Sequence, residues 1–261
     1  MARIGPEDLL RELDHAVRAA IGADREATIA YSGGLDSSIV AALGSRHSLV
    51  KCYTCALPDS HDARNAKEMA AKDGLELKVV TLNTGDVRGL VCRASKLLDS
   101  GDPVRIAYTI PLMSVIDESS VPLVLAGNGA DELFGGYARY LTSEDAREEM
   151  AKDLSKAVLE ANAIENYAQR SGKRFACPFL DEGLPDFCAE IELERLVRDG
   201  RRKLILREVA SVLSLHTSEM PKKAAQYSSG IMKEMKRQAR VSELSLSNWM
   251  TSVLSGSKES N

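Results

Sequence analysis

A run of glycine and serine residues at positions 32–38 carries the strongest chemical signal in this sequence. The surrounding stretch from Thr28 to Ser38 reads Thr-Ile-Ala-Tyr-Ser-Gly-Gly-Leu-Asp-Ser-Ser, in which a segment typical of a buried strand enters Gly33-Gly34. Glycines can turn backbone N–H groups inward because they adopt positive φ without a steric penalty. Apolar residues after Ser38 recur at helical spacing, and the first N–H groups of a helix favour anions. We therefore predict a phosphate site, with Asp36 as a ligand for a divalent cation.

This loop lacks the lysine of the commoner phosphate-binding pattern. That pattern places a lysine directly before its Ser or Thr, where the lysine neutralises the β- and γ-phosphates. Here Asp36 takes that place, and no lysine follows until Lys51. A glycine turn that only joins a strand to a helix is the alternative, but the serines and the aspartate favour a phosphate site. Ser-Gly-Gly-Leu-Asp-Ser-Ser resembles the loop of ATP pyrophosphatases, which split ATP between its α- and β-phosphates.

A second glycine-rich segment, from Ala126 to Tyr137, reads Ala-Gly-Asn-Gly-Ala-Asp-Glu-Leu-Phe-Gly-Gly-Tyr. Together with the first loop it resembles the synthetase domain of asparagine synthetases, where Gly-Glu-Gly-x-Asp-Glu-Leu-Phe-Gly-Gly-Tyr is characteristic. Three later segments resemble that family in the same order: 177–181 (Cys-Pro-Phe-Leu-Asp), 203–207 (Lys-Leu-Ile-Leu-Arg) and 222–230 (Lys-Lys-Ala-Ala-Gln-Tyr-Ser-Ser-Gly). The resemblance covers roughly residues 7–240, and motifs of this length in unbroken order rarely coincide by chance.

The resemblance implies an AMP-forming ligase that uses ATP and Mg²⁺. In that chemistry a substrate carboxylate attacks the α-phosphate of ATP, pyrophosphate leaves, and ammonia or an amine then displaces AMP. Nucleotide contacts are implied for Ala30, Ser32, Gly33, Gly34, Leu35, Asp36, Ser37, Ser38, Cys55 and Gly127. Mg²⁺ is assigned to Asp36 and Asp131, because this hard cation prefers carboxylate oxygens and phosphates. Catalytic roles are implied for Asp36, Asn128, Lys203 and Lys223, with Lys203 supplying the positive charge that the loop lacks.

Several positions depart from the family's pattern. Asn128 stands where the family has glutamate, and an amide side chain cannot act as a base. Ala107 and Ala176 stand where arginines are expected, although Arg105 is near the first of them. A pocket without two arginines would no longer hold aspartate in the usual way, so we expect another carboxylate substrate. Residue 2 is Ala, not the family's cysteine nucleophile, so we expect no glutaminase activity in this chain and leave room for a separate glutaminase subunit.

Two other functions fit parts of this pattern. Other ATP pyrophosphatases adenylate a nucleobase in RNA, but a pI near 5.7 and the lack of an appended RNA module argue against a nucleic-acid partner. A nucleotide-binding regulator that has lost catalysis is supported by Asn128, whereas Asp36, Asp131 and Lys203 oppose it. RNA-dependent ATP consumption would favour the first alternative, and the absence of pyrophosphate release with candidate acids would favour the second.

Strands and helices alternate through the first half of the chain. Apolar periodicity predicts helices over 7–21, from about 61, over 87–98 and over 106–117, and strands over 27–31, 48–56, 75–82 and 121–126. This alternation predicts an α/β fold with a mostly parallel sheet flanked by helices, similar to the adenine nucleotide α-hydrolases. Ligands then bind beyond the carboxyl ends of the strands. We expect residues 1–140 to form this core with its N-terminal helix, and residues 141–261 to form a helical extension, helical over 142–170 and 195–215, that completes the active site.

The bulk composition is that of a soluble globular protein. Of 261 residues, 44% are hydrophobic and 28% charged, with a net charge of −4. No apolar run is long enough to span a membrane, and the first residues do not resemble a signal peptide. Five cysteines favour reduced thiols in the cytoplasm. Residues three apart in a strand point to opposite faces, so we expect Cys52 and Cys55 to be buried core residues rather than metal ligands. A homo-oligomer is compatible with this sequence.

Overall fold

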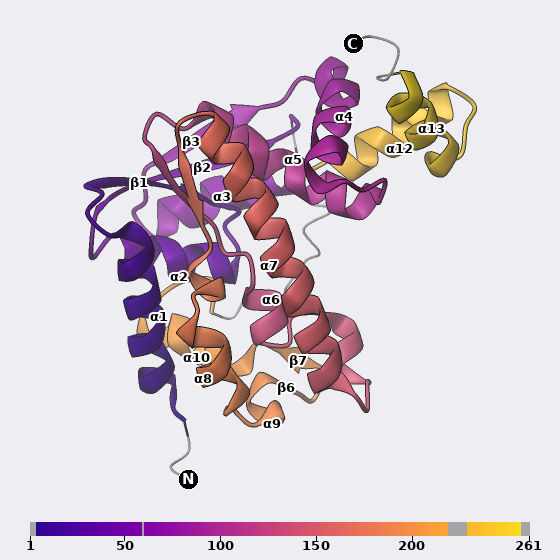
Figure 1. The fold of residues 1–261 in the computed structure, drawn as a ribbon. Helices are drawn as coiled ribbons and strands as arrows, with labels where there is room; N and C mark the ends of the chain where they lie inside the picture. The colour runs from indigo at the N-terminus through magenta and orange to yellow at the C-terminus, as the bar shows by residue number, and fades with distance from the viewer. Residues whose placement is uncertain (1–3, 59, 219–228, 257–261) are drawn as a thin grey trace.

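Five parallel strands form the central sheet of the computed structural model, which describes residues 4–58, 60–218 and 229–256. The sheet has the order β3-β2-β1-β4-β5, and all four neighbouring pairs run parallel (Figure 1). Its strands are β1 (Glu26–Ala30), β2 (Leu49–Ala56), β3 (Leu77–Thr81), β4 (Leu123–Leu125) and β5 (Arg174–Ala176). The expected α/β fold with a parallel sheet is confirmed. Because β1 and β4 are neighbours, the two glycine-rich segments leave adjacent strands at the same edge of the sheet.

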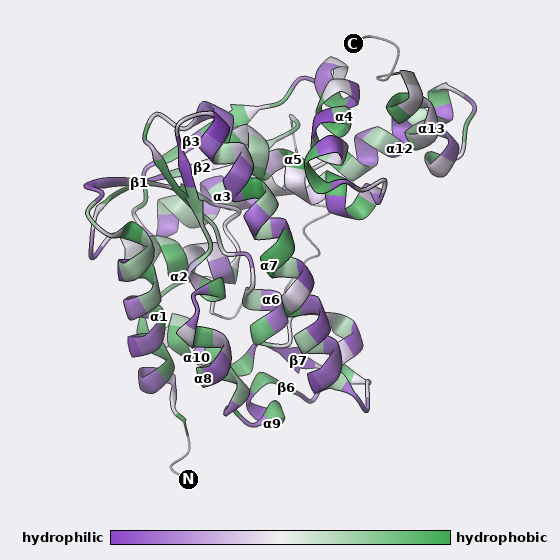
Figure 2. Ribbon diagram, in the orientation of Figure 1, coloured by the Kyte–Doolittle hydropathy of each residue, from purple (hydrophilic) through white to green (hydrophobic). Residues whose placement is uncertain are grey.

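Helices pack on both faces of the sheet and bury two apolar clusters. One cluster receives residues from α1 (Pro6–Ile21), α2 (Leu35–Gly44), α3 (His61–Lys72) and α10 (Leu204–Val212). The other receives residues from α4 (Val87–Leu98), α5 (Pro103–Glu118), α12 (Ile231–Val241) and α13 (Leu246–Gly256). The long α7 (Ala146–Arg170) contributes to both clusters. Figure 2 shows hydrophilic and hydrophobic residues alternating along α1 and α7, as expected of helices with one face on a core.

Local sequence signals explain several helix ends. Pro6 occupies the first turn of α1, where its missing N–H group costs no hydrogen bond. Ser60 caps α3 by accepting a hydrogen bond from the N–H group of Ala63 at 3.2 Å. Gly74 follows α3 with a φ of +67°, the left-handed conformation that commonly ends a helix. Residue types that favour helix ends therefore stand at the start of α1 and at both ends of α3.

The two strand cysteines are buried on opposite faces of the sheet. Cys52 packs in the first cluster and Cys55 in the second, and both are free thiols. Burial raises the pKa of each thiol to about 12. Neither side chain is therefore suited to hold a metal as a thiolate, and the core assignment is confirmed.

Two features of the C-terminal half differ from the expectation of helix alone. Residues 174–176 form β5, which pairs with β4 and completes the sheet. The expected helix over 195–215 is wrong in its first part: α9 (Leu193–Leu196) ends early, and an antiparallel hairpin of β6 (Val197–Arg198) and β7 (Arg201–Arg202) follows. The turn residues Asp199 and Gly200 have φ values of +51° and +72°. Positive φ at both central residues defines the tight turn that Asp-Gly favours.

Short elements connect the remaining parts of the chain. They are η1 (Thr84–Asp86), α6 (Ala130–Leu133), η2 (Ala138–Leu141), η3 (Pro178–Leu180) and α8 (Gly183–Ala189). Figure 1 shows α8, α9, α10 and the β6–β7 hairpin gathered at one end of the molecule, with α12 and α13 at the other. None of the described helices has the length and hydropathy that crossing a bilayer requires.

Candidate functional site

Two loops leave the carboxyl edge of the sheet, and the second packs on the helix that follows the first. The first loop (residues 31–34) joins β1 to α2, and the second loop (residues 126–129) joins β4 to α6. A Cβ atom at Gly127 would lie 2.9 Å from Cβ of Asp36 and 3.2 Å from N of Ser37. Only glycine allows this approach, so the backbone of the second loop packs directly on the start of α2.

Lys203 joins the two helices that follow these loops through its ammonium group. Its Nζ lies 2.6 Å from Oδ1 of Asp36, at the start of α2, and 2.6 Å from Oδ1 of Asp131, in α6. The lysine is 2% exposed, whereas each aspartate side chain is 26% exposed. Burial lowers the pKa of Lys203, and the adjacent Asp36 carboxylate opposes that shift. One ammonium and two carboxylates carry a net negative charge. The aspartate side chains that carry it are partly open to solvent.

The backbone around Lys203 is shaped to bring this ammonium inward. Lys203 lies between β7 and α10 and has a φ of +57°. This left-handed conformation marks the point where the chain leaves the strand and enters the helix. Gly136 lies against the same side chain. A Cβ atom there would lie 1.8 Å from Oδ1 of Asp131 and 2.6 Å from Cε of Lys203. Arg202 fixes the Gly136 carbonyl by donating a hydrogen bond at 2.8 Å.

Serine hydroxyl groups line the first loop. Ser37 Oγ accepts a hydrogen bond from the N–H group of Ser32 at 3.2 Å and donates one to the Gly34 carbonyl at 3.2 Å. Ser32 Oγ lies 3.3 Å from Ser37 Oγ and accepts a hydrogen bond from the N–H group of Gly34. Ser32 is exposed, so its hydroxyl group is accessible to an anion.

The other residues predicted to bind nucleotide differ in how far they are buried. Ser38 is fully buried, and its hydroxyl group lies 3.3 Å from the hydroxyl of Tyr31. Leu35 packs against the first apolar cluster. Ala30 is half-buried at the end of β1, and Cys55 is buried in β2, so any contact from Cys55 would come from its backbone. Their roles in nucleotide binding stay predictions. Lys223 lies outside the described residues.

A buried glutamate next to Asp131 was not predicted as a site residue. Glu132 is 8% exposed and accepts a hydrogen bond from the Tyr137 hydroxyl at 2.5 Å. Burial raises the pKa of Glu132, whereas the Tyr137 hydrogen bond and the charge of Lys203 oppose that shift. The acidic pair 131–132 was visible in the sequence, and the family resemblance assigned Mg²⁺ to Asp131, but no signal in the sequence indicated that Glu132 would be buried beside it.

Three positions where the family's pattern has a base or an arginine carry neither. Asn128 is half-buried in the second loop. Ala107 is fully buried in α5, and Ala176 is half-buried in β5. Arg105 does not replace the missing cations, because its Nε donates to Oε1 of Glu160 at 2.6 Å. Glu160 also accepts a hydrogen bond from the hydroxyl group of Tyr108.

The oxygen atoms of Asp36 and Asp131 suit Mg²⁺. Mg²⁺ is usually bound in proteins by one or two carboxylates, with phosphates and water completing its shell. Within the described ranges, no group of three or more His, Cys, Asp or Glu residues could hold a metal without further ligands. The pair of carboxylates that contact Lys203 therefore fits a cation that arrives with a phosphate substrate.

Comparison with known proteins identifies the family. The model of the family described as Asparagine synthase matches residues 8–174, and this range holds both loops. The chain belongs to the asparagine synthase family. A Methanocaldococcus jannaschii protein that carries the name asparagine synthetase (glutamine-hydrolyzing) 1 is 30% identical over 273 residues, which cover 86% of this chain and 50% of that protein. Asparagine synthetase B (glutamine-hydrolyzing) of Escherichia coli is 24% identical and matches 77% of this chain and 41% of its own length.

The chain thus spans about half the length of the curated relatives it matches. Lys203 lies beyond the range of the family model, and the resemblance of residues 203–207 had already implied a role for it. Among solved structures, NMN synthetase from Francisella tularensis superimposes with a TM-score of 0.45 and 11% identity, over 97% of this chain and 94% of that one.

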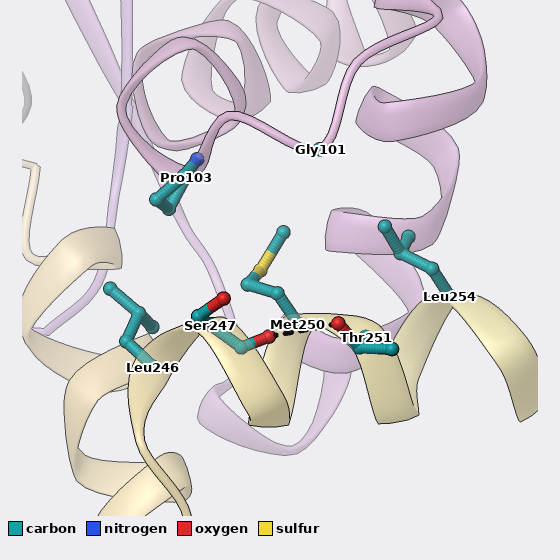
Figure 3. Close-up of a pocket in the computed structure, with 7 residues that line it drawn as sticks. All are labelled: Gly101, Pro103, Leu246, Ser247, Met250, Thr251 and Leu254. Carbon is teal, nitrogen blue, oxygen red and sulfur yellow. Dashed lines mark hydrogen bonds between the residues drawn. The ribbon is translucent and has the colours of Figure 1, made fainter.

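A separate hollow of about 330 Å³ lies between α13 and the turn that precedes α5 (Figure 3). Pro103 and Gly101 line one side, and Leu246, Ser247, Met250, Thr251 and Leu254 line the other. The hydroxyl group of Thr251 already donates to the carbonyl of Ser247 at 3.1 Å. None of these residues belongs to the two loops, so the hollow is distinct from the candidate site.

Proposed function

We propose that this chain is an AMP-forming, ATP-dependent ligase that adenylates a carboxylic acid and transfers the acyl group to ammonia or an amine. The observation that carries this proposal is the contact of Lys203 with both Asp36 and Asp131, at the starts of the helices that follow the two loops. Membership of the asparagine synthase family supports an ATP-using enzyme of this kind.

The charges at the site suit the first half-reaction. A carboxylate oxygen of the acid attacks the α-phosphorus, the bond to the bridging oxygen breaks, and pyrophosphate leaves. Negative charge grows on that leaving group, so cations aimed at it stabilise the transition state. Lys203 would supply one such cation, and the serines and N–H groups of the first loop would hold the terminal phosphates. Asp36 and Asp131 would hold Mg²⁺, which would neutralise phosphate charge when bound.

The second half-reaction needs an amine without its extra proton. The nitrogen attacks the acyl carbon, the bond to the AMP oxygen breaks, and the nitrogen loses a proton. Asn128 cannot accept that proton, because an amide oxygen is a very weak base. We therefore infer that the amine enters deprotonated or that another group takes the proton.

The acid is proposed to differ from aspartate. Ala107 and Ala176 carry no charge, and Arg105 is neutralised by Glu160. A second carboxylate on the substrate would find no bidentate arginine partner at these positions, and such partners are the strongest side-chain ligands for carboxylates.

A screen for carboxylate-dependent exchange between ATP and labelled pyrophosphate tests the function. At least one acid should support exchange, and AMP should be the nucleotide product once an amine is added. Lys203→Ala should abolish exchange while adenosine binding is retained. Exposed Lys233→Ala is the matched control and should exchange at the normal rate. ADP as the product would contradict the proposal, and so would exchange that does not depend on Lys203.

A further inference from the structure

Asn65, on the second turn of α3, contacts the first loop from outside the motif that the sequence identifies. Its Nδ2 lies 2.9 Å from the carbonyl oxygen of Gly33 and 3.1 Å from that of Ser32. Both partners are acceptors, so the amide must present its NH₂ group to them. One side chain thus holds two consecutive carbonyl groups of the loop.

These two hydrogen bonds fix the direction of the neighbouring N–H groups. In a planar trans peptide the C=O and N–H groups point in opposite directions. The carbonyl of Ser32 shares its peptide with the N–H group of Gly33, and the carbonyl of Gly33 shares its peptide with that of Gly34. Because both carbonyls point toward α3, both N–H groups point away from α3. The N–H group of Gly34 lies 3.3 Å from Ser32 Oγ, so an anion at the loop would meet this hydroxyl and the N–H groups rather than carbonyl oxygens.

The contact is tight on both sides. Gly33 has a φ of +71°, and a Cβ atom there would lie 2.8 Å from Nδ2 of Asn65 and 2.9 Å from Cα of Ala66. The helix that carries Asn65 is itself fixed, because Ser60 caps its first turn and Ala66 and Met69 are buried in the core. Asn65 therefore holds the loop against a rigid support.

Resting on the proposed function, we propose that Asn65 is a positioning residue for the pyrophosphate end of the nucleotide. It does not touch the substrate. It keeps the N–H groups of Gly33 and Gly34 turned toward the phosphates, so its loss weakens binding of the phosphate chain and leaves binding of the adenosine end unchanged.

The substitution Asn65→Asp tests this role with almost no change in shape. A carboxylate cannot donate to the two carbonyls, and it repels both of them as well as a bound phosphate. Asn65→Ala removes the donors without adding charge. Asn166→Asp makes the same chemical change at an exposed position of α7 and serves as the matched control.

Calorimetric titration of the full-length chain with pyrophosphate in the presence of Mg²⁺, and separately with adenosine, gives the result. We expect Asn65→Asp to weaken pyrophosphate binding by about tenfold or more, and Asn65→Ala by a smaller factor, because two hydrogen bonds are lost. Adenosine affinity should stay within about twofold of the wild-type value in both variants. The control should bind both ligands as the wild type does.

Unchanged pyrophosphate binding by Asn65→Asp would overturn the inference while leaving the proposed function intact. An equal loss of both ligands, together with a lower unfolding temperature, would reduce Asn65 to a folding role and would also overturn it. Failure of the wild-type chain to bind pyrophosphate would overturn the proposed function itself, and the inference with it.

Discussion

At the scale of single residues, the site depends on how closely one ammonium group approaches two carboxylates. The 2.6 Å contacts of Lys203 with Asp36 and Asp131 require that no side chain stand between them. Gly136 meets that requirement, because it lies against both Asp131 and Lys203. A glycine that looks like part of a turn motif is therefore a part of the charged site.

Replacing Gly136 with alanine should disable the site. The new Cβ atom would lie 1.8 Å from Oδ1 of Asp131, a distance that forces the carboxylate or the lysine to move. We expect pyrophosphate exchange to fall by about 100-fold or more, because the charged groups leave the positions that stabilise the transition state. The exchange assay described above provides the measurement.

Gly89→Ala is the matched control for this substitution. Gly89 lies inside α4, and a Cβ atom there would meet nothing within 4 Å. Alanine favours a helix interior over glycine by roughly 1 kcal/mol, so this variant should be active and slightly more stable. Normal exchange by Gly136→Ala would show that the site tolerates displacement of Asp131 and Lys203.

A second prediction for a single residue concerns Glu132 and the pH dependence of stability. Burial raises the pKa of Glu132 in the folded protein above its value in the unfolded chain. The folded state then binds more protons, so the free energy of unfolding falls as pH rises through the window between the two pKa values. Glu132→Gln lacks this loss and can still accept the Tyr137 hydrogen bond, so it should be more stable than the wild type at pH 8.

Urea titrations of wild type and Glu132→Gln at several pH values measure the difference. It should shrink toward zero as pH falls below the ordinary glutamate pKa, because both chains then carry a neutral side chain. Exposed Glu182→Gln is the control and should show little dependence on pH relative to wild type. A difference that stays constant from pH 4 to pH 8 would contradict an ionised, buried Glu132.

At the scale of elements, the β6–β7 hairpin sets where α10 begins. The turn at Asp199 and Gly200 reverses the chain, β7 runs back along β6, and Lys203 follows β7 directly. Arg207, one turn into α10, donates hydrogen bonds to the carbonyl of Arg202 at 3.0 Å and to that of Ser218 at 2.8 Å. The backbone that enters Lys203 is thus held by the hairpin on one side and by Arg207 on the other.

Gly200→Ala should destabilise the hairpin turn that leads the chain into Lys203. Gly200 has a φ of +72°, a conformation that costs an L-residue with a Cβ roughly 1–2 kcal/mol. We expect the unfolding temperature to fall by about 2–8 °C, and exchange activity to fall with it because β7 leads into Lys203. Differential scanning calorimetry and the exchange assay measure the two effects.

Gly183→Ala offers a control, since Gly183 has no positive φ and a Cβ there would meet nothing within 4 Å. It should leave both the unfolding temperature and activity close to wild type. If Gly200→Ala behaved the same way, the turn would not constrain the start of α10.

Much of the fold could be predicted from the sequence, because long apolar periods identify α1, α4 and the strands of the core. Residues 174–176 gave no such signal, since three residues are too few for alternation to show. The Asp199-Gly200 pair is a hairpin signal, but it lies within a stretch whose overall pattern is helical. Lys203 and Asp36 are 167 residues apart in the sequence, so only the family's motifs could predict that they lie in one site. Asn65 lies outside any motif, so only the packing of α3 on the loop reveals it.

At the scale of the whole molecule, the sheet separates two apolar clusters, and each cluster contains residues from distant segments of the chain. The second cluster runs from the sheet through α4 and α5 to α12 and α13, and it includes Trp249 at 1% exposure. That cluster therefore ties the C-terminal helices to strands that the two loops follow. Domains that share a continuous core unfold together, because neither part buries enough apolar surface alone.

The single tryptophan makes this cooperativity measurable. Trp249 fluorescence reports on α13, whereas far-ultraviolet circular dichroism reports on all helices. If the shared cluster joins α13 to the core, the two signals should change at the same urea concentration. Mg²⁺ with pyrophosphate at about 100 times its dissociation constant should raise both midpoints together, by an amount that corresponds to roughly 2.7 kcal/mol. A fluorescence transition that precedes the dichroism change, and that ligand does not shift, would mean that α13 unfolds independently of the loops.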